Sequence, residues 1–428
     1  MKKKYNLTSS QIRVLFEFDE NGNIIFTNKN VIWGHLKINQ ELDFNRLKDS
    51  LNYCFQKNDS IRLKLCKEDD KLLQYFEDFE EQNFEIVDVN TEKDVQKLEN
   101  DIINKPFEMF NSYLFQVAIY RYKNGFGGII IKINHVIADG YTLGLLLYEL
   151  LGYYSKTINK IISFSYLDYI KSEEKYPNSI KYKQDKLYWN KMLDNGVPDI
   201  AYIPSNKEKY SFSKANKLAF DIDKDTIKIV KNYCKKNKIS NSTFYMSIYA
   251  IYIYKKTNLT NFFLSAANRN RRNIKEMLTA GMTTKVAYFI VKIQNEKFVD
   301  FTKKIRLSLK SSYKHMNYIY NYKNELFERY NDNRALPSNV FISYQDLKVD
   351  TDKMNINFEI TGDNNTGTYG TDVVSIHIFE YKNNVKIIYD YLTEKYSKED
   401  ITNINNSIIN IIKQVSKDNN INIQDIKV

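Results

Sequence analysis

Residues 131–142 read IKINHVIADGYT, and this segment decides how the rest of the chain is interpreted. Its first residues alternate as in a strand, whereas residues 141–154 carry apolar side chains at helical spacing. Asp139 and Gly140 stand at the junction, where a carboxylate accepts hydrogen bonds from the first helical turn and a glycine permits a steep turn. His135 is therefore held at the tip of a strand by rigid structure, from which its ring can meet a substrate.

The residues alone leave two interpretations of this junction open. In the first, Asp139 only caps the helix and His135 is an interior histidine. In the second, His135 is catalytic, because a neutral imidazole near pH 7 can accept a proton from an attacking group or hydrogen-bond to it. The chain has four histidines, and His35, His315 and His377 lack comparable surroundings. We therefore take His135 as the candidate catalytic residue and the other three as structural.

The segments before this junction alternate between helices and strands. Asp43 is expected to cap a helix over residues 44–55, and residues 61–65 alternate like a strand with one buried side. Residues 113–120 and 128–133 are predicted strands joined by the Asn124-Gly125 turn. Residues 155–195 are polar and contain Pro177, which indicates a connecting region.

The second half contains similar elements. Predicted strands cover residues 218–222, 262–266, 340–344, 373–380 and 385–390, the last two joined through Asn383-Asn384. Predicted helices follow Asp225, Ser240 and Ser397 as capping residues. Each half is thus α/β with a mixed sheet, and we divide the chain into residues 1–170 and 171–428.

Composition excludes several classes of protein. A chain of 428 residues with 43% hydrophobic residues is long enough for two lobes. The formal charge of +11 fits an acidic partner, but it also fits a sequence rich in Lys, Asn, Ile and Tyr, which AT-rich codons encode. No basic stripe or zinc-finger spacing indicates nucleic-acid binding.

Cysteine usage and hydropathy indicate the compartment. Cys54, Cys66 and Cys234 form no CxxC pair, which favours a reducing environment. The most apolar segment, residues 143–151, is short and contains Glu149, so we expect no membrane span. Charged residues interrupt the basic N-terminus before any export signal. We therefore expect a cytoplasmic protein.

The segment NHVIADG, residues 134–140, resembles the HHxxxDG signature of nonribosomal-peptide condensation domains and related acyltransferases. The resemblance extends along nearly the whole chain. Further segments resembling that family are residues 7–11 (LTSSQ), 59–62 (DSIR), 106–107 (PF), 166–169 (YLDY), 267–271 (ANRNR) and 388–391 (IYDY).

The resemblance implies two chloramphenicol-acetyltransferase-like lobes in a V-shaped pseudo-dimer, each a mixed sheet flanked by helices. A tunnel between the lobes would hold the active site. In such enzymes an acyl group arrives as a thioester on the phosphopantetheine arm of a carrier protein, and an amine, or less often a hydroxyl, attacks it. No cofactor is expected in the domain itself.

The resemblance also implies roles for individual residues. Asp139 would pair with Arg62 and hold the loop together with Gly140, and a partly buried pair of that kind is costly to break. Asn134 replaces the first His of the signature, a position that usually supports structure in this family. An intact His135 next to Asn134 argues for ordinary condensation rather than heterocyclisation.

Two segments of the second half also bear on the site. Residues 280–286 (AGMTTKV) retain only Gly281 of the family's pattern, and Thr283, Thr284 and Lys285 are candidates for lining a tunnel. Residues 341–345 (FISYQ) resemble a strand whose polar residues, Ser343 and Gln345, face the active site. Ser343 either donates to a developing oxyanion or is simply a polar strand position.

The expected function is amide-bond formation by a stand-alone, monomeric condensation enzyme whose carrier protein acts in trans, since no adenylation or carrier region is seen in the sequence. A basic face would favour an acidic carrier. An ester-forming O-acyltransferase, an acyl-CoA-dependent one, and a non-catalytic condensation-like recruitment module remain alternatives. No metal-ligand spacing or phosphate-binding glycine loop occurs. The donor, the acceptor and the product are not encoded in a recognisable way.

Overall fold

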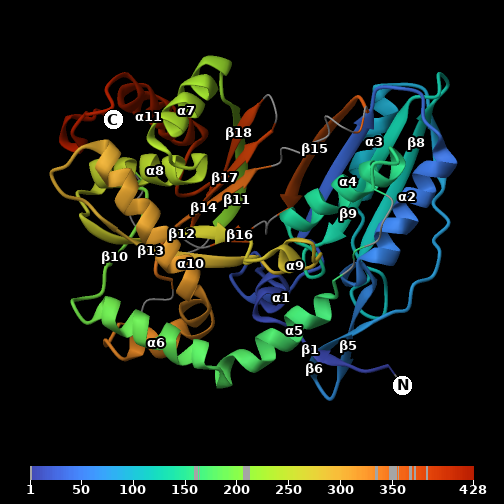
Figure 1. The fold of residues 1–428 in the computed structure, drawn as a ribbon, viewed down its shortest axis with the longest axis horizontal. Coiled ribbons are helices and arrows are strands. Elements are labelled where there is room, and N and C mark those ends of the chain that lie inside the picture. The colour runs from blue at the N-terminus through green and yellow to red at the C-terminus, as the bar shows by residue number, and fades with distance from the viewer. Residues whose placement is uncertain are drawn as a thin grey trace.

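The computed structural model describes residues 2–158, 162, 164–205, 213–332, 336–346, 354, 356–365, 369–370, 373–381 and 384–428. Two lobes form a V in Figure 1, each with a sheet backed by helices. The lobes meet near the bottom of the V, where α1 (Ser9–Val14), α9 (Ile274–Met277) and α5 (Tyr166–Lys175) lie. The sequence-based prediction of two α/β lobes is confirmed.

The N-terminal lobe is built on a five-stranded mixed sheet. Its order is β15 (Phe358–Asn365), β4 (Val31–Ile38), β9 (Gly127–Asn134), β8 (Phe115–Tyr122) and β7 (Ile86–Val89), with only the β7–β8 pair parallel. Its helices are α2 (Phe44–Lys57), α3 (Glu92–Asn104) and α4 (Gly140–Tyr154). Smaller pieces are the sheet β1 (Tyr5–Asn6), β6 (Lys71–Phe76) and β5 (Leu63–Glu68), the hairpin β2 (Phe16–Phe18) and β3 (Ile24–Phe26), and the 3₁₀ turn η1 (Asp59–Arg62).

Strand β15 links the two halves of the chain. It comes from the second half of the sequence, yet it pairs antiparallel with β4 and so extends the sheet of the first half. Within this pairing Gly362 lies opposite Gly34. The two lobes are therefore joined by backbone hydrogen bonding as well as by side chains.

The C-terminal lobe holds an eight-stranded sheet. Its strands are β10 (Asp199–Ile200), β12 (Asn261–Asn268), β14 (Val340–Asp346), β17 (Val374–Glu380), β18 (Val385–Leu392), β11 (Ser213–Asp221) and β16 (Tyr369–Gly370), with β13 (Lys285–Lys292) also paired to β12. Its helices are α6 (Ile180–Leu193), α7 (Lys224–Asn237), α8 (Asn241–Thr257), α10 (Phe298–Glu328) and α11 (Lys398–Lys417), with the 3₁₀ turns η2 (Tyr176–Asn178) and η3 (Ile423–Asp425). Strands β12, β14 and β17 are parallel, and the pairings of β18 and β13 are antiparallel.

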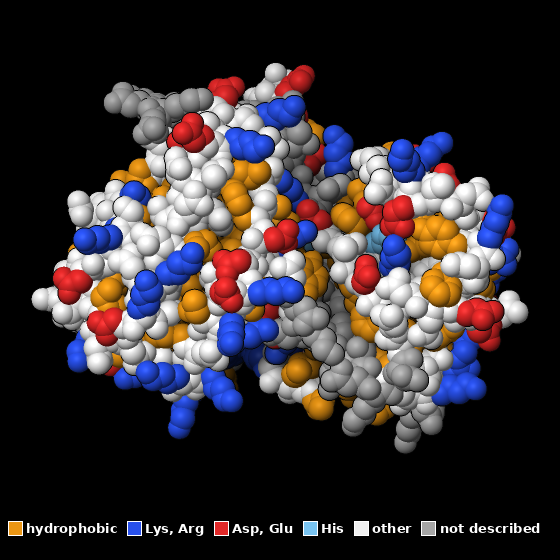
Figure 2. Space-filling model, turned by 90° about the horizontal axis from the view of Figure 1, so that it is seen from above, with side chains coloured by type: hydrophobic (Ala, Val, Ile, Leu, Met, Phe, Trp, Pro, Cys, Tyr) orange, Lys and Arg blue, Asp and Glu red, His pale blue; other side chains and the backbone are white. Residues whose placement is uncertain are grey.

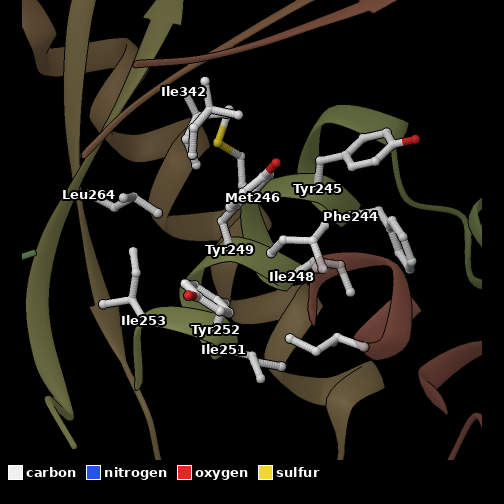
Figure 3. Close-up of a cluster of buried hydrophobic side chains, with 14 of the residues drawn as sticks. Phe244, Tyr245, Met246, Ile248, Tyr249, Ile251, Tyr252, Ile253, Leu264 and Ile342 are labelled. Carbon is white, nitrogen blue, oxygen red and sulfur yellow. The ribbon is translucent and has the colours of Figure 1, made fainter. Parts of the chain in front are cut away.

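Helix α8 forms the centre of the C-terminal core. Every residue from position 243 to position 253 is buried, which is typical of a helix that is covered on all sides. Figure 3 shows Tyr249 and Ile253 of α8 close to Leu264 of β12 and Ile342 of β14. This packing supports β14, which is the strand of this sheet that carries Ser343 and Gln345.

Several local predictions are confirmed and others are wrong. Asp43 caps α2 by accepting from Arg46 N at 3.0 Å, and Gly125 (φ +80°) turns the β8–β9 hairpin. Helix α7 is capped by Asp223 rather than by the expected Asp225. The region 155–195 is more than a connector, because it contains α5 and α6. The β17–β18 pairing is confirmed, but Asn383 of its predicted turn lies outside the described residues.

Two further observations complete the fold. The predicted strand 61–65 starts only at Leu63, since η1 takes up the residues before it. Among the described helices, none has the length and hydropathy needed to cross a bilayer.

Candidate active site

The loop that carries His135 is held by hydrogen bonds from both of its flanks. The backbone N–H of His135 donates to Asn30 O at 2.9 Å, and that of Asn134 donates to Leu114 O at 2.8 Å. The side-chain oxygen of Asn134 accepts from Val136 N at 3.0 Å. Asn134 is almost fully buried, so its amide turns the chain at the end of β9 and stays out of the cavity.

The LTSSQ segment supports the same loop from the other side. Thr8 and Gln11 form a capping box at the start of α1. The buried Gln11 amide also donates to Val136 O at 3.1 Å and to the side chain of Gln74 at 2.7 Å. This segment of the family pattern therefore has a structural explanation here.

The ring of His135 lies beside open space. Its Nδ1 is buried and makes no hydrogen bond to any residue of the described structure. Burial lowers the pKa of His135 below its ordinary 6.5, and the charge of Asp139 only partly opposes this shift. The imidazole is therefore neutral at pH 7, in the form that accepts a proton or a hydrogen bond.

A cavity of about 470 Å³ contacts His135, and both lobes contribute to its walls. Helix α4 and strand β4 form one side, with Gly140, Gly144 and Trp33 among the lining residues. Strand β15 extends that side through its pairing with β4, and strands β14 and β17 of the C-terminal lobe form the other side, with Gln345 and Phe379. Figure 2, which looks down on the molecule from above, shows a groove between the two lobes.

Asp139 is bonded to the second half of the chain. Its Oδ2 accepts from Arg271 Nη1 at 2.8 Å and its Oδ1 from Arg271 Nη2 at 3.2 Å, a bidentate pair. Oδ1 also accepts from the N–H and the hydroxyl of Thr142, both at 2.9 Å. Both side chains of the ion pair are 1% exposed.

Thr283 and Thr284 complete this cluster. Both residues donate to Asp139 Oδ2 through backbone N–H and hydroxyl groups, at 2.9–3.3 Å. Asp139, Thr142, Arg271, Thr283 and Thr284 are called the Asp139 anchor below. Burial alone would raise the pKa of Asp139, but the charge and hydrogen bonds of Arg271, with those of Thr142, lower it to about 2.

The predicted pairing of Asp139 with Arg62 is wrong. Arg62 ends η1, and its guanidinium donates to the backbone carbonyls of Phe55, Gln56 and Glu77. The carbonyls at the end of α2 lack helical partners, so Arg62 caps that helix instead of reaching the loop. The partner of Asp139 is Arg271, which lies in ANRNR, one of the segments that resemble the family.

Gly281 fits closely against the Asp139 anchor. Its φ of +145° is unusual for other residues, and a Cβ there would lie 2.2 Å from Tyr166 Cδ2. Its carbonyl accepts from Arg271 Nη2 at 3.0 Å, and its N–H donates to the Thr142 hydroxyl at 2.9 Å. The Tyr166 hydroxyl donates to Met282 O at 2.7 Å. The retained glycine thus allows two segments from different halves to touch.

A second buried ion pair stands near the anchor. Lys285 Nζ donates to the Glu173 carboxylate at 2.7 Å and to Asn317 Oδ1 at 3.0 Å, with the lysine side chain 0% exposed. Lys285 is thus committed to a structural pair. A polar cavity of about 590 Å³ lies here, lined by Glu173, Thr283 and Arg271 among others.

The remaining predicted site residues lie on β14. Gln345 lines the cavity that contains His135, and a Cβ on Gly140 would lie 2.6 Å from Gln345 Oε1, so the two residues are in close contact. Ser343 is buried and accepts from Gln345 Nε2 at 3.4 Å. Gln345 is therefore the first of the two that a bound molecule would meet.

Comparisons with known proteins agree with this geometry. The Condensation domain family matches residues 1–428. Surfactin synthase subunit 1 of Bacillus subtilis (strain 168) is 23% identical over 394 residues, which cover 89% of this chain and 11% of that protein. Bacitracin synthase 1 of Bacillus licheniformis is 20% identical over 439 residues, covering 100% of this chain and 8% of that protein. The chain thus spans a small part of the length of these relatives.

Solved structures share the fold over nearly the full length. The condensation domain from Monacolin K polyketide synthase superposes with a TM-score of 0.80 at 12% identity, covering 98% of this chain and 99% of that one. The starter condensation domain of rhizomide synthetase, in complex with C8-CoA, gives a TM-score of 0.77 at 14% identity, covering 99% and 98%. This chain belongs to the condensation-domain family, whose members catalyse acyl transfer in nonribosomal peptide synthesis.

Proposed function

We propose that this chain transfers an acyl group from a carrier-bound thioester to an amine, with His135 as the catalytic residue. The observation that carries the proposal is that His135, which is only partly buried, lines a cavity formed by both lobes, while its Nδ1 faces inward away from solvent. His377 also has a buried Nδ1 without a hydrogen-bond partner among the described residues, but it does not line this cavity, so the contact with the cavity is what distinguishes His135. A neutral imidazole in that position is suited to general-base or hydrogen-bonding chemistry.

The reaction balances without any further reactant. The amine nitrogen attacks the thioester carbonyl, a C–N bond forms and the C–S bond breaks. The amine loses one proton and the leaving thiolate gains one. His135 accepts or hydrogen-bonds the amine proton in this step, and Asp139 holds the loop from which the ring projects.

Gln345 is our candidate for contacting the developing oxyanion. Its side chain packs on Gly140 at the edge of the cavity, and an amide N–H donates well to a developing negative charge. Ser343 lies behind it and acts as a positioning residue, since its hydroxyl accepts from the Gln345 amide.

The donor in this proposal is attached to the phosphopantetheine arm of a carrier domain outside residues 1–428. The known relatives are large synthases of which this chain matches a small part. The net charge of +11 supports association with an acidic carrier. The same chemistry with a hydroxyl acceptor would give an ester, which the test below distinguishes.

The test is reconstitution with loaded carrier. Purified chain is incubated with acyl carrier protein and a panel of amines and alcohols, and products are followed by mass spectrometry. We expect amide products that disappear in His135→Ala. Ester products alone would replace the amide assignment, and binding of carrier without any turnover would favour a recruitment module. Unaltered turnover in His135→Ala would show that His135 is not catalytic.

A further inference from the structure

Glycines form an unusual share of the cavity that contains His135. The chain has only 13 glycines, and four of them line this one cavity. They are Gly34 on β4, Gly140 and Gly144 on α4, and Gly362 on β15. The four positions differ in what a side chain there would meet.

At three of the four positions a Cβ would meet neighbouring atoms. A Cβ on Gly362 would lie 2.5 Å from Trp33 O, one on Gly140 would lie 2.6 Å from Gln345 Oε1, and one on Gly34 would lie 3.3 Å from Leu143 Cδ2. The contact with backbone accounts for glycine at Gly362, whereas at Gly140 and Gly34 a larger residue would displace the side chains of Gln345 and Leu143.

Gly144 is different, because a Cβ there would meet no atom within 4 Å. Glycine inside a helix costs about 1 kcal/mol relative to alanine. At Gly144 nothing in the packing offsets that cost. The open space next to Gly144 is therefore the feature that distinguishes this position from the other three.

Gly140, Gly144 and Tyr148 follow one another at four-residue spacing on α4, which places them along one face of the helix. All three line the cavity. Eight residues of helix advance about 12 Å. A fully extended backbone advances about 1.2 Å per bond, so a hydrocarbon chain of about ten bonds spans the distance from Gly140 to Tyr148.

The walls beside this stripe are apolar. Leu143 and Leu147 flank it on α4, Ile360 comes from β15 in the sheet of the same lobe, and Phe379 comes from β17 of the opposite lobe. The charged lining residues are Asp346 and Asp363, both acidic and both on the C-terminal strands. Asp363 is paired with Lys217 at 3.4 Å, and a hydrocarbon chain fits the apolar wall formed by the leucine, isoleucine and phenylalanine side chains.

We propose that Gly144 determines the length of a hydrocarbon acyl donor, with about eight to ten carbons accommodated between His135 and Tyr148. This inference rests on the proposed function, because it takes the cavity to be the donor site. In it, Gly144 leaves the middle of the stripe open, and Tyr148, which is 39% exposed, marks the end of the stripe at the protein surface.

The test measures binding, so that it does not depend on turnover. The probes are acyl-pantetheine analogues with a ketone in place of the thioester, in a series from two to fourteen carbons, titrated calorimetrically into the full chain. Each buried methylene strengthens binding about fourfold. We expect the wild-type affinity to rise with length and to level off at about eight to ten carbons.

A large side chain at position 144 should lower the chain length at which the affinity levels off. Gly144→Phe fills the open space, and we expect its affinity for long probes to fall at least tenfold while two-carbon binding stays within twofold. Gly144→Ala is the matched control, since it adds one methyl group and should be more heat-stable than wild type. Tyr148→Ala shortens the apolar wall at its exposed end and should move the plateau to shorter probes.

The outcomes separate this inference from the proposed function. A length profile that is the same in wild type and Gly144→Phe would overturn the inference, as would a wild-type affinity that does not depend on length. Length-dependent binding without amide formation in the carrier assay would leave the inference standing and refute the proposed function. Amide formation without length-dependent binding would refute the inference and leave the proposed function standing.

Discussion

His135 and Asp139 lie four residues apart in one loop and have opposite environments. His135 is partly buried and lines a cavity, whereas Asp139 is fully buried and both of its oxygens are occupied by Thr142 and by residues of the second half of the chain. The difference separates two tasks. Asp139 binds the lobes together, and the position of the loop that results leaves His135 available for chemistry.

The largest expected effect is on activity at His135. His135→Ala should lower the rate of amide formation by about 10²–10⁴-fold, the range typical of a general acid–base group. Because the ring nitrogen has no partner to lose, the unfolding free energy should change little. Turnover numbers with loaded carrier and denaturant unfolding of both proteins measure the two effects. If His135→Ala lost much of its unfolding free energy but kept its turnover, His135 would be a structural residue and the contrast with Asp139 would not hold.

The Asp139 anchor should show the opposite pattern, with stability affected first. Asp139→Ala leaves a buried Arg271 charge without its partner, and we expect a loss of about 3–5 kcal/mol in unfolding free energy. Arg271→Ala should cost a similar amount. Chemical denaturation of each variant measures these losses, and an Asp139→Ala protein as stable as wild type would contradict the anchor.

Arg62 provides the control for this pair. The double variant Asp139→Ala/Arg271→Ala should lose less than the sum of the single losses, because the two side chains interact directly. Asp139→Ala/Arg62→Ala should be additive, because Arg62 bonds to backbone carbonyls elsewhere. Coupling between Asp139 and Arg62 would restore the pairing that the sequence suggested.

The C-terminal wall of the cavity should contribute an intermediate effect. Gln345→Ala removes the proposed oxyanion donor, and a loss of about 100-fold in turnover is expected. Ser343→Ala should lower turnover less, because Ser343 acts through Gln345. Gln345→Glu is the informative companion, since it keeps the size and one hydrogen-bonding oxygen but loses the N–H donors. Equal losses in Ser343→Ala and Gln345→Ala would move the donor role to Ser343.

Local features of the fold could be predicted from sequence because they depend on neighbouring residues. The strand end at His135, the cap at Asp139 and the cap at Asp43 all follow from short patterns. Long-range partners could not be predicted in this way. Arg271 is 132 positions from Asp139. The residues around Arg271 in the sequence do not indicate which carboxylate it will contact.

Other differences have a similar physical origin. Helices α5 and α6 lie in a polar region without a strong apolar stripe, and tertiary contacts stabilise them, such as the Tyr166 hydroxyl on Met282 O. Strand β15 joins the sheet of the other lobe, and no local pattern specifies a partner so distant. The open space at Gly144 is likewise visible only after both lobes are in place.

A smaller effect is expected at acid pH through Asp139. Its pKa is about 2 in the folded chain against an ordinary 3.8, so the carboxylate contributes about 2 kcal/mol of stability above pH 3.8. That contribution is lost as the pH falls from 3.8 towards 2, when the folded state takes up the proton. Urea unfolding at several pH values should show this slope in wild type and lack it in Asp139→Asn.

The smallest expected effect is a shift in the acid limb of the pH–rate profile. Burial lowers the pKa of His135 below 6.5, so more than half of the rings stay neutral at pH 6.5, and activity should fall only at lower pH. The rate of amide formation, measured from pH 5 to 8 with saturating loaded carrier, should therefore have its inflection below 6.5. The residual activity of His135→Ala should lack this inflection. An inflection above pH 6.5 would mean that a nearby negative charge raises the pKa of His135 more than burial lowers it. Asp139 would then control the protonation of His135, and the two residues would not have separate tasks.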